Sequence, residues 1–219
     1  MTHTRTALAV AMLAVASTGA SAQAIVNGDF DARQADQATA RYMTTDLGGG
    51  WTTVFGNVDL VGHGGDDGNS AELKALMGST ATSGLAVDLN GNTPAMITQV
   101  LNTIAGQQYS LSFSYAANPG TDSNATAGFA FQLSPVKGGT LGASLIGQGA
   151  SWQTYATTFV ATGATALSFI STAYGTPTFG AMVDNVSVSA VPEPSEYAMM
   201  MLGLGVIGAA ARRRQRKSA

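Results

Sequence analysis

The chain of 219 residues contains no cysteine. This absence excludes disulfide cross-links, so the fold must be held together by buried apolar side chains or by a bound metal. Charged residues are also scarce, because Asp, Glu, Lys and Arg make up only 11% of the chain, whereas glycine occurs 27 times. This composition argues against a helix bundle and favours an all-β protein with many turns.

Histidine is nearly absent as well, and His63 is the only one beyond the first 24 residues. A Ser-His-Asp arrangement would have to use it, and no Gly-x-Ser-x-Gly elbow precedes a helix. We interpret His63 as an exposed loop residue. Paired carboxylates such as Asp59 and Asp88 leave one route to catalysis open, but nothing in the sequence marks them as unequal. The sequence therefore predicts that the protein is not an enzyme.

Basic residues are missing from the middle of the chain. Residues 25–194 contain four basic and twelve acidic residues, a net charge of −8, while the other basic residues lie near the two ends. Nucleic-acid binding depends on Lys and Arg that neutralise phosphates. We therefore expect no nucleic-acid partner, and an acidic body that suits an exported protein.

The first 24 residues, MTHTRTALAVAMLAVASTGASAQA, have the three parts of a secretory signal peptide. Arg5 supplies the positive region, Ala7–Val15 the apolar region, and small residues up to Ala24 the cleavage site. We predict that residues 1–24 are removed on export and that a single domain covers residues 25–190.

Alternation of apolar and polar residues predicts β-strands in that domain. Tyr109–Tyr115 alternates without a break, and the pattern returns at Phe129–Leu133, Leu167–Phe169 and Met182–Val188. Gly-rich turn signals separate about nine or ten short strands, which favours a jelly-roll β-sandwich of two antiparallel sheets. Residues 71–77 predict a short helix, and residues 31–46 a long loop.

One short pattern, V-D-L-x-G, occurs twice, at Val58–Gly62 and at Val87–Gly91. Two occurrences do not make a repeat protein. Each Asp is suited to closing a strand by accepting hydrogen bonds from turn amides. The alternative interpretation places one of these carboxylates at a binding surface.

The chain ends with VPEPSEYAMMMLGLGVIGAAARRRQRKSA. The apolar run Tyr197–Ala211 would form a helix of about 22 Å, shorter than the ~30 Å core of a bilayer. The arginines that follow should hold the last residues in the cytoplasm. We predict a short transmembrane helix that is held briefly and then cut, with a permanent tail anchor as the alternative.

These features together resemble the PEP-CTERM sorting signal of Gram-negative bacteria. The resemblance rests on residues 191–219, and its motif residues are Pro192, Glu193, Pro194, Arg212, Arg213 and Arg214. It implies an exosortase as partner, which is an intramembrane transpeptidase-like enzyme. It also implies a transient stay in the inner membrane, followed by the cell surface or extracellular matrix.

The body resembles the choice-of-anchor C family of galactose-binding-like jelly rolls. The matching stretches include Val26–Phe30, Gly56–Gly62, Val87–Gly91, Ser151–Tyr155 and Val183–Val188. Such jelly rolls often hold a structural calcium where the first and last strands lie side by side. The resemblance therefore implies Asp31 and Asp184 as calcium ligands, with two solvated acids as the alternative.

Three aromatic residues are candidates for contact with carbohydrate: Trp51, Trp152 and Tyr155. The alternative is packing in the core or at its rim, which is the more common role of a tryptophan beside glycine-rich turns in a β-sandwich, because it buries a large apolar area. We expect an exported, non-catalytic protein associated with exopolysaccharide or another carbohydrate. The alternatives are a structural biofilm-matrix protein without a specific ligand, and a glycan-active enzyme.

Overall fold

The computed structural model describes residues 25–32, 41–62, 75–76, 84–120, 126–148, 151–172 and 179–215. The predicted signal peptide and His63 lie outside the described residues. So does most of the predicted helix at 71–77, of which Ala75 and Leu76 are described as helical.

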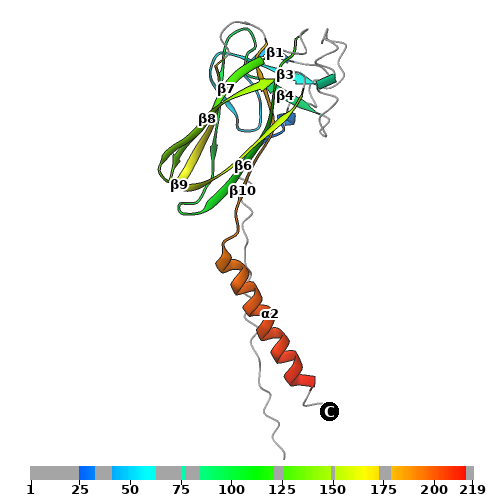
Figure 1. Ribbon diagram of the computed structural model, residues 1–219, viewed down its shortest axis with the longest axis vertical. Helices are drawn as coiled ribbons and strands as arrows, with labels where there is room; N and C mark the ends of the chain where they lie inside the picture. Colours follow the sequence, from blue (N-terminus) through cyan, green and yellow to red (C-terminus); the bar gives the residue numbers. More distant parts are fainter. Residues whose placement is uncertain are drawn as a thin grey trace, which may run out of the picture.

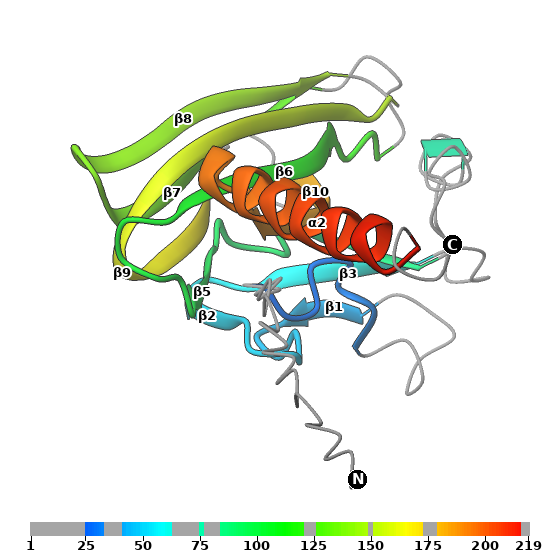
Figure 2. The same cartoon turned by 90° about the horizontal axis from the view of Figure 1, so that it is seen from below.

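The described residues form two packed layers of antiparallel strands and one C-terminal helix (Figures 1 and 2). Sheet A has the order β1-β3-β4-β10-β6-β9, and sheet B has the order β2-β5-β9-β7-β8. The long strand β9 belongs to both sheets. The bounds are β1 Arg41–Thr44, β2 Thr52–Phe55, β3 Val58–Gly62, β4 Leu85–Asp88, β5 Met96–Leu101, β6 Gln108–Ala117, β7 Thr126–Val136, β8 Gly139–Gln148, β9 Gln153–Ser171 and β10 Ala181–Ala190. The predicted jelly-roll sandwich is confirmed.

Alternation places one side of each strand in the core between the sheets. Tyr109, Leu111 and Phe113 of β6 are buried as predicted, and the Phe113 ring meets Phe169 of β9 edge-on at 5.0 Å between centroids. Every residue of this core lies between Ile25 and Val188. The segment 25–193, here called the sandwich domain, therefore contains the complete described core and does not need the helix for it.

The prediction of a loop over residues 31–46 was wrong for residues 41–44, which form strand β1. This strand pairs with β3, with Arg41 opposite Leu60. Its four residues are too few to show a period of two, and the pairing with β3 rather than local sequence makes them a strand.

The N-terminal segment docks on an irregular point of β10. The register between β10 and β6 shifts after Asp184, where Asn185 has a φ of 53°. This bulge frees the Val186 amide to donate to the Gly28 carbonyl at 2.8 Å. A side chain on Gly28 would collide with the Val186 carbonyl, so this close approach requires glycine.

The charged residues of the strands all belong to sheet A. They are Arg41 in β1, Asp59 in β3, Asp88 in β4 and Asp184 in β10. The strands β2, β5, β7, β8 and β9 contain none.

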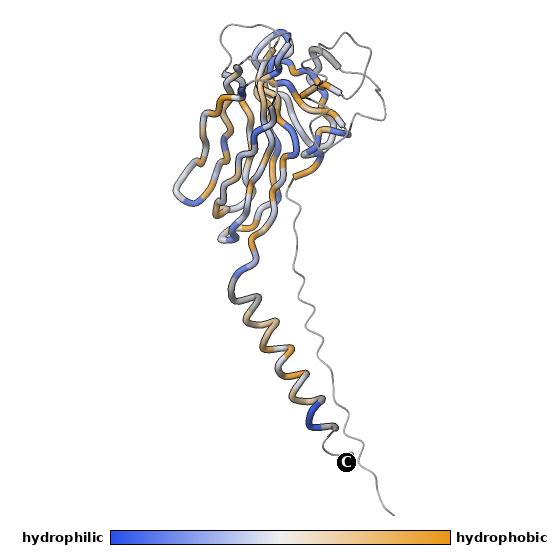
Figure 3. Tube along the Cα trace, turned by 45° about the vertical axis from the view of Figure 1, so that its right-hand side comes forward, coloured by the Kyte–Doolittle hydropathy of each residue, from blue (hydrophilic) through white to orange (hydrophobic). Residues whose placement is uncertain are grey.

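Helix α2, Pro194–Gln215, leaves the sandwich after β10 (Figure 1). Its apolar side chains from Met199 to Ile207 are exposed, and the hydropathy along it ends in the hydrophilic Arg cluster (Figure 3). Within the described part of the chain, no helix reaches the length and apolarity needed to cross a membrane. The predicted sorting helix is confirmed as a helix, and it begins three residues before the apolar run.

Candidate functional site

The two V-D-L-x-G motifs lie side by side. β3 and β4 pair antiparallel, and Asp59 stands directly opposite Asp88. Their neighbours Val58, Leu60 and Val87 point into the core, so both carboxylates lie on the outer side of sheet A. Both are nevertheless buried.

The Asp88 carboxylate joins segments that are far apart in sequence. It accepts hydrogen bonds from the Asn90 amide at 2.9 Å, from the Gly180 amide at 3.0 Å and from the Asn118 side-chain amide at 2.6 Å. The bond from Asn90 is the turn closure that the sequence predicted for this motif. The other two donors come from the loop after β6 and from the residue before β10.

Complete burial raises the pKa of Asp88 from its usual value of 3.8 to about 7. The three amide donors lower this pKa and the neighbouring Asp59 raises it, but both effects are smaller than that of burial. Its buried hydrogen bonds place Asp88 to hold these segments together.

Exposed polar groups surround this network. Asn57 and Asn92 bond to each other twice, through side-chain amide to oxygen at 2.7 Å and backbone amide to oxygen at 2.9 Å. Phe179, with 43% of its surface exposed, packs against Gly120. We call this set the loop-end cluster: Asn57, Asp59, Asp88, Asn90, Asn92, Asn118 and Phe179.

The loop-end cluster lies at the opposite end of β10 from the tail. β10 begins at Ala181, beside Gly180, and ends at Ala190, four residues before the helix (Figure 1). Ten residues of strand span about 30 Å. An anchored tail would therefore hold the cluster away from the anchor.

Trp51 is a core residue. Only 6% of its surface is exposed, its indole N–H donates to the Asn27 carbonyl at 2.9 Å, and its ring lies 5.3 Å from Phe30 and 5.9 Å from Phe169. The ring has no open face for a sugar, which corrects the prediction that Trp51 contacts carbohydrate.

Trp152 and Tyr155 are half-buried and pack on opposite sides of sheet A. Tyr155 stacks on Phe113 at 5.3 Å and borders the main core. Trp152 donates to the Leu76 carbonyl at 3.1 Å and packs on the outer side of sheet A, against a small cluster that includes Met182. Since Met182 is the β10 partner of Asp88, Trp152 lies near the loop-end cluster, whereas Tyr155 does not. Sugar contact by either residue stays a prediction.

Asp31 and Asp184 lie at the same end of β4. Asp31 accepts from the Leu85 amide at 2.7 Å, and burial raises its pKa. Asp184 lies on β10, one residue beyond the pair formed by Val183 and Val87. Its two oxygens accept from the backbone and side-chain amides of Asn185, at 2.6 and 3.1 Å.

The described contacts of these two carboxylates are thus with N–H donors, whereas calcium needs about six to eight oxygen ligands. No group of three or more His, Asp or Glu suited to a metal occurs within the described ranges. Asp31 and Asp184 would supply two of the required oxygens, and the calcium site stays a prediction.

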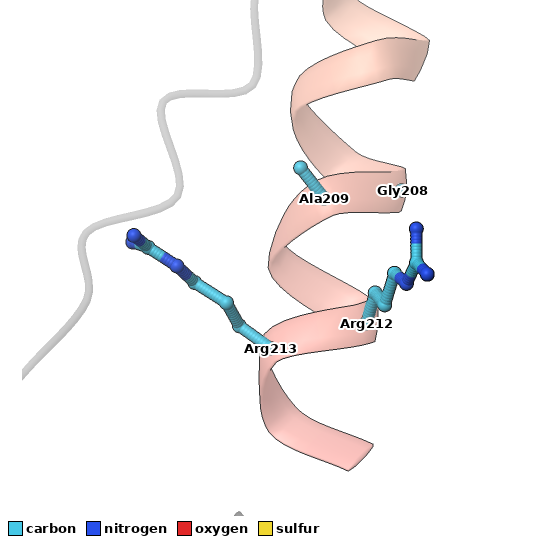
Figure 4. A pocket seen from close by; sticks show the side chains of 4 residues that line it. All are labelled: Gly208, Ala209, Arg212 and Arg213. Atoms are coloured by element: carbon cyan, nitrogen blue, oxygen red, sulfur yellow. The ribbon is translucent and has the colours of Figure 1, made fainter. Parts of the chain in front are cut away.

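The residues of the predicted sorting motif lie at the two ends of helix α2. Pro192 and Glu193 are exposed just before it, and Pro194 is its first residue, where a missing amide proton costs nothing. Arg212 and Arg213 project from different sides of its last turns (Figure 4). They line a surface hollow with Gly208 and Ala209 of the same helix.

Comparison with known families now assigns the two parts of the chain. Residues 23–189 match a family described as a protein of unknown function, DUF642. The chain belongs to the DUF642 family. After the DUF642 domain, residues 190–215 match the PEP-CTERM protein-sorting motif, which confirms the predicted sorting signal. The motif marks an exported protein that is sorted by an exosortase.

Two carbohydrate-binding modules are among the solved structures to which this chain is similar. TmCBM61 in complex with β-1,4-galactotriose has a TM-score of 0.50 and 12% identity, over 77% of this chain and 99% of that one. The CBM22-1 xylan-binding domain of Paenibacillus barcinonensis Xyn10C has a TM-score of 0.44 and 13% identity, over 70% and 90%. The likeness to TmCBM61 shows the jelly-roll fold. A comparison with curated proteins finds no match.

Sequence reasoning missed Asn118, Gly180 and Phe179. The V-D-L-N-G motif pointed to Asp88, but its partners come from loops 30 and 92 residues further along the chain. The Asn-Pro-Gly turn at 118–120 was the available signal, and it predicts a turn without predicting what the asparagine contacts.

Proposed function

We propose that the protein is a non-catalytic component of the cell surface or extracellular matrix and binds exopolysaccharide through the loop-end cluster. The exosortase cuts its tail near Pro194 after a transient stay in the inner membrane. Trp152 extends the contact surface beside the cluster.

The observation that carries this proposal is the chemistry and position of the loop-end cluster. Asn57, Asn92 and the exposed ring of Phe179 offer amide groups and an apolar face, which suit the hydroxyls and C–H surfaces of sugars. The buried bonds of Asp88 hold these loops in place, so the surface is largely ordered before a ligand arrives. The fold shared with carbohydrate-binding modules supports this choice of ligand class.

Binding is tested with the sandwich domain and insoluble polysaccharide from the producing organism, in a pull-down. A soluble β-1,4-galactan serves as a first defined ligand, because the neighbour TmCBM61 was solved with β-1,4-galactotriose. We expect Phe179→Ala combined with Asn92→Ala to weaken binding about 10-fold or more, which corresponds to about 1.4 kcal/mol. Ile104→Ala, an exposed apolar residue in the loop after β5, is the control. Wild-type domain that binds no polysaccharide would favour a purely structural matrix protein, and product release from the polysaccharide would favour an enzyme.

Sorting is tested by intact mass spectrometry of the secreted protein. We expect a mass that ends near Pro194 in cells with the exosortase, and uncut protein in the membrane fraction without it. Replacing Arg212, Arg213 and Arg214 with Gln should leave the protein unprocessed. A secreted product that still carries Ala219 would contradict removal of the tail.

A further inference from the structure

The outer face of sheet B is a regular surface built by five strands. The register of those strands aligns three rows of side chains. These rows point outward, because their neighbours Ile97, Phe131 and Phe169 point into the core. The central row is Thr52, Thr98, Ser168, Gln132 and Gly142; the flanking rows are Met96, Ile170, Ala130 and Ser144, and Val100, Ala166 and Ser134. We call these residues, with Val54, Phe55 and Ile146, the sheet-B face.

Large aliphatic side chains on this face are open to solvent. The exposed fractions are 64% for Val100, 60% for Ile146 and 53% for Val54. They stand on three different strands, β5, β8 and β2, so the exposure extends across the sheet. Val100 and Ile146 stand on opposite sides of the central row of Thr, Ser, Gln and Gly, so the exposed aliphatic groups are spread over a mixed, uncharged face that is open to packing by another surface.

The same face carries no charge. The strands of sheet B contain no Asp, Glu, Lys or Arg, whereas residues 25–194 as a whole have a net charge of −8. Two copies of so acidic a domain repel each other wherever their charged surfaces meet. The sheet-B face is where they approach without that repulsion.

We propose that the sheet-B face is a self-association surface on which two copies of the protein pack sheet against sheet. β-sheets stack face to face at about 10 Å, with interdigitated aliphatic side chains like those exposed here. Sugar-binding platforms rely on several aromatic rings, whereas this face has one, Phe55, which is 50% exposed and stands opposite Met96 at the end of edge strand β2. The aliphatic composition therefore favours a second copy over a polysaccharide chain.

The size of the face sets the strength of the pairing. Five strands at about 4.8 Å spacing and three rows about 7 Å apart give an area of roughly 500 Å² per copy. The total of roughly 1,000 Å² lies below the 1,200–2,000 Å² of stable complexes. The pairing is thus weak and concentration-dependent, and in a dense matrix it would join two sugar-binding ends into one bivalent unit.

Sedimentation equilibrium of the sandwich domain, from low micromolar to near-millimolar concentration, tests the proposal. We expect a monomer–dimer equilibrium that tightens with added salt, because salt screens the repulsion between the acidic bodies. Val100→Glu combined with Ile146→Glu should weaken dimerisation at least ~10-fold, since each dimer would bury added like charges. Both positions are exposed, so an unchanged unfolding midpoint will show that the variant is folded.

The matched control is Thr154→Glu combined with Thr158→Glu, which adds the same charge at exposed positions of β9 within sheet A. It should dimerise nearly as the wild type does. A mixture of the Glu variant with Val100→Lys/Ile146→Lys should form heterodimers more tightly than either variant forms homodimers. This rescue requires that the two faces meet.

Two results would overturn the proposal. The first is a wild-type domain that stays monomeric over the whole concentration range. If the Glu variant of this monomer also lost polysaccharide retention, the face would be a sugar-binding surface instead. The second is a Glu variant that dimerises as strongly as the wild type.

Discussion

The two sheets of this sandwich share one core but differ in the charge and solvent exposure of their outer faces. Sheet A holds all four charged residues of the strands, and its outer face is covered where Trp152 and Leu76 pack over Met182. Sheet B holds none, and its aliphatic side chains stand open to solvent. The three carboxylates Asp59, Asp88 and Asp184 of sheet A are buried, and Asp88 fixes the loops around it, whereas Val54, Val100 and Ile146 of sheet B are exposed. The first arrangement serves stability, and the second leaves a face for association.

The largest test of this contrast removes the buried carboxylate of sheet A. Asp88→Ala leaves the amides of Asn90, Gly180 and Asn118 buried without their acceptor, so we expect a loss of about 4 kcal/mol in the free energy of unfolding. Gln132→Ala, on the sheet-B face, should change it by less than about 0.5 kcal/mol. Urea denaturation of both variants measures the difference. Equal losses would mean that the two faces contribute alike.

A second test uses pH. The unfolded chain holds the Asp88 proton with the ordinary pKa of 3.8, and the folded protein with a pKa of about 7. The folded state therefore binds more protons between these values, and stability falls as pH rises through them. We expect a loss on the order of 1 kcal/mol per pH unit between about pH 4 and 7. Asp88→Asn should flatten this slope, and a slope that Asp88→Asn leaves unchanged would assign it to other groups.

A smaller effect is expected at the cover of sheet A. Trp152→Ala removes a half-buried ring and its bond to the Leu76 carbonyl, which should cost about 2 kcal/mol. Ile146→Ala, on the open face of sheet B, should cost less than about 0.5 kcal/mol. Thermal unfolding followed by circular dichroism compares them. If the two variants unfolded at the same temperature, the packing of Trp152 over sheet A would contribute no measurable stability.

Sequence alone could predict the layers of this fold but not the contrast between them. The alternation in Tyr109–Tyr115 states which residues point to the core, because side-chain direction has a period of two. The alternation does not predict which outer face is covered, because the cover of sheet A is formed by Leu76 and Trp152, which are distant from β6 in the sequence. The same limit explains Trp51, whose burial follows from Phe30 and Phe169 and not from its own neighbours. The burial of these residues depends on contacts between distant parts of the chain, which the local sequence pattern does not predict.

The smallest expected effect concerns calcium, which can act only where carboxylates are available. Asp31 and Asp184 meet this condition at the end of β4 in sheet A, and the strands of sheet B offer no carboxylate. A metal that binds the folded state alone stabilises it by mass action, by about 1.4 kcal/mol at ten times its dissociation constant. We expect calcium added to the chelated sandwich domain to raise the unfolding midpoint, and Asp184→Ala to abolish the rise. Magnesium is the control, because it demands a stricter octahedral geometry than calcium and should raise the midpoint less. If the wild-type midpoint does not move with calcium, the amide donors of Leu85 and Asn185 are sufficient partners for these two acids, and the buried charges of sheet A are satisfied by protein groups alone.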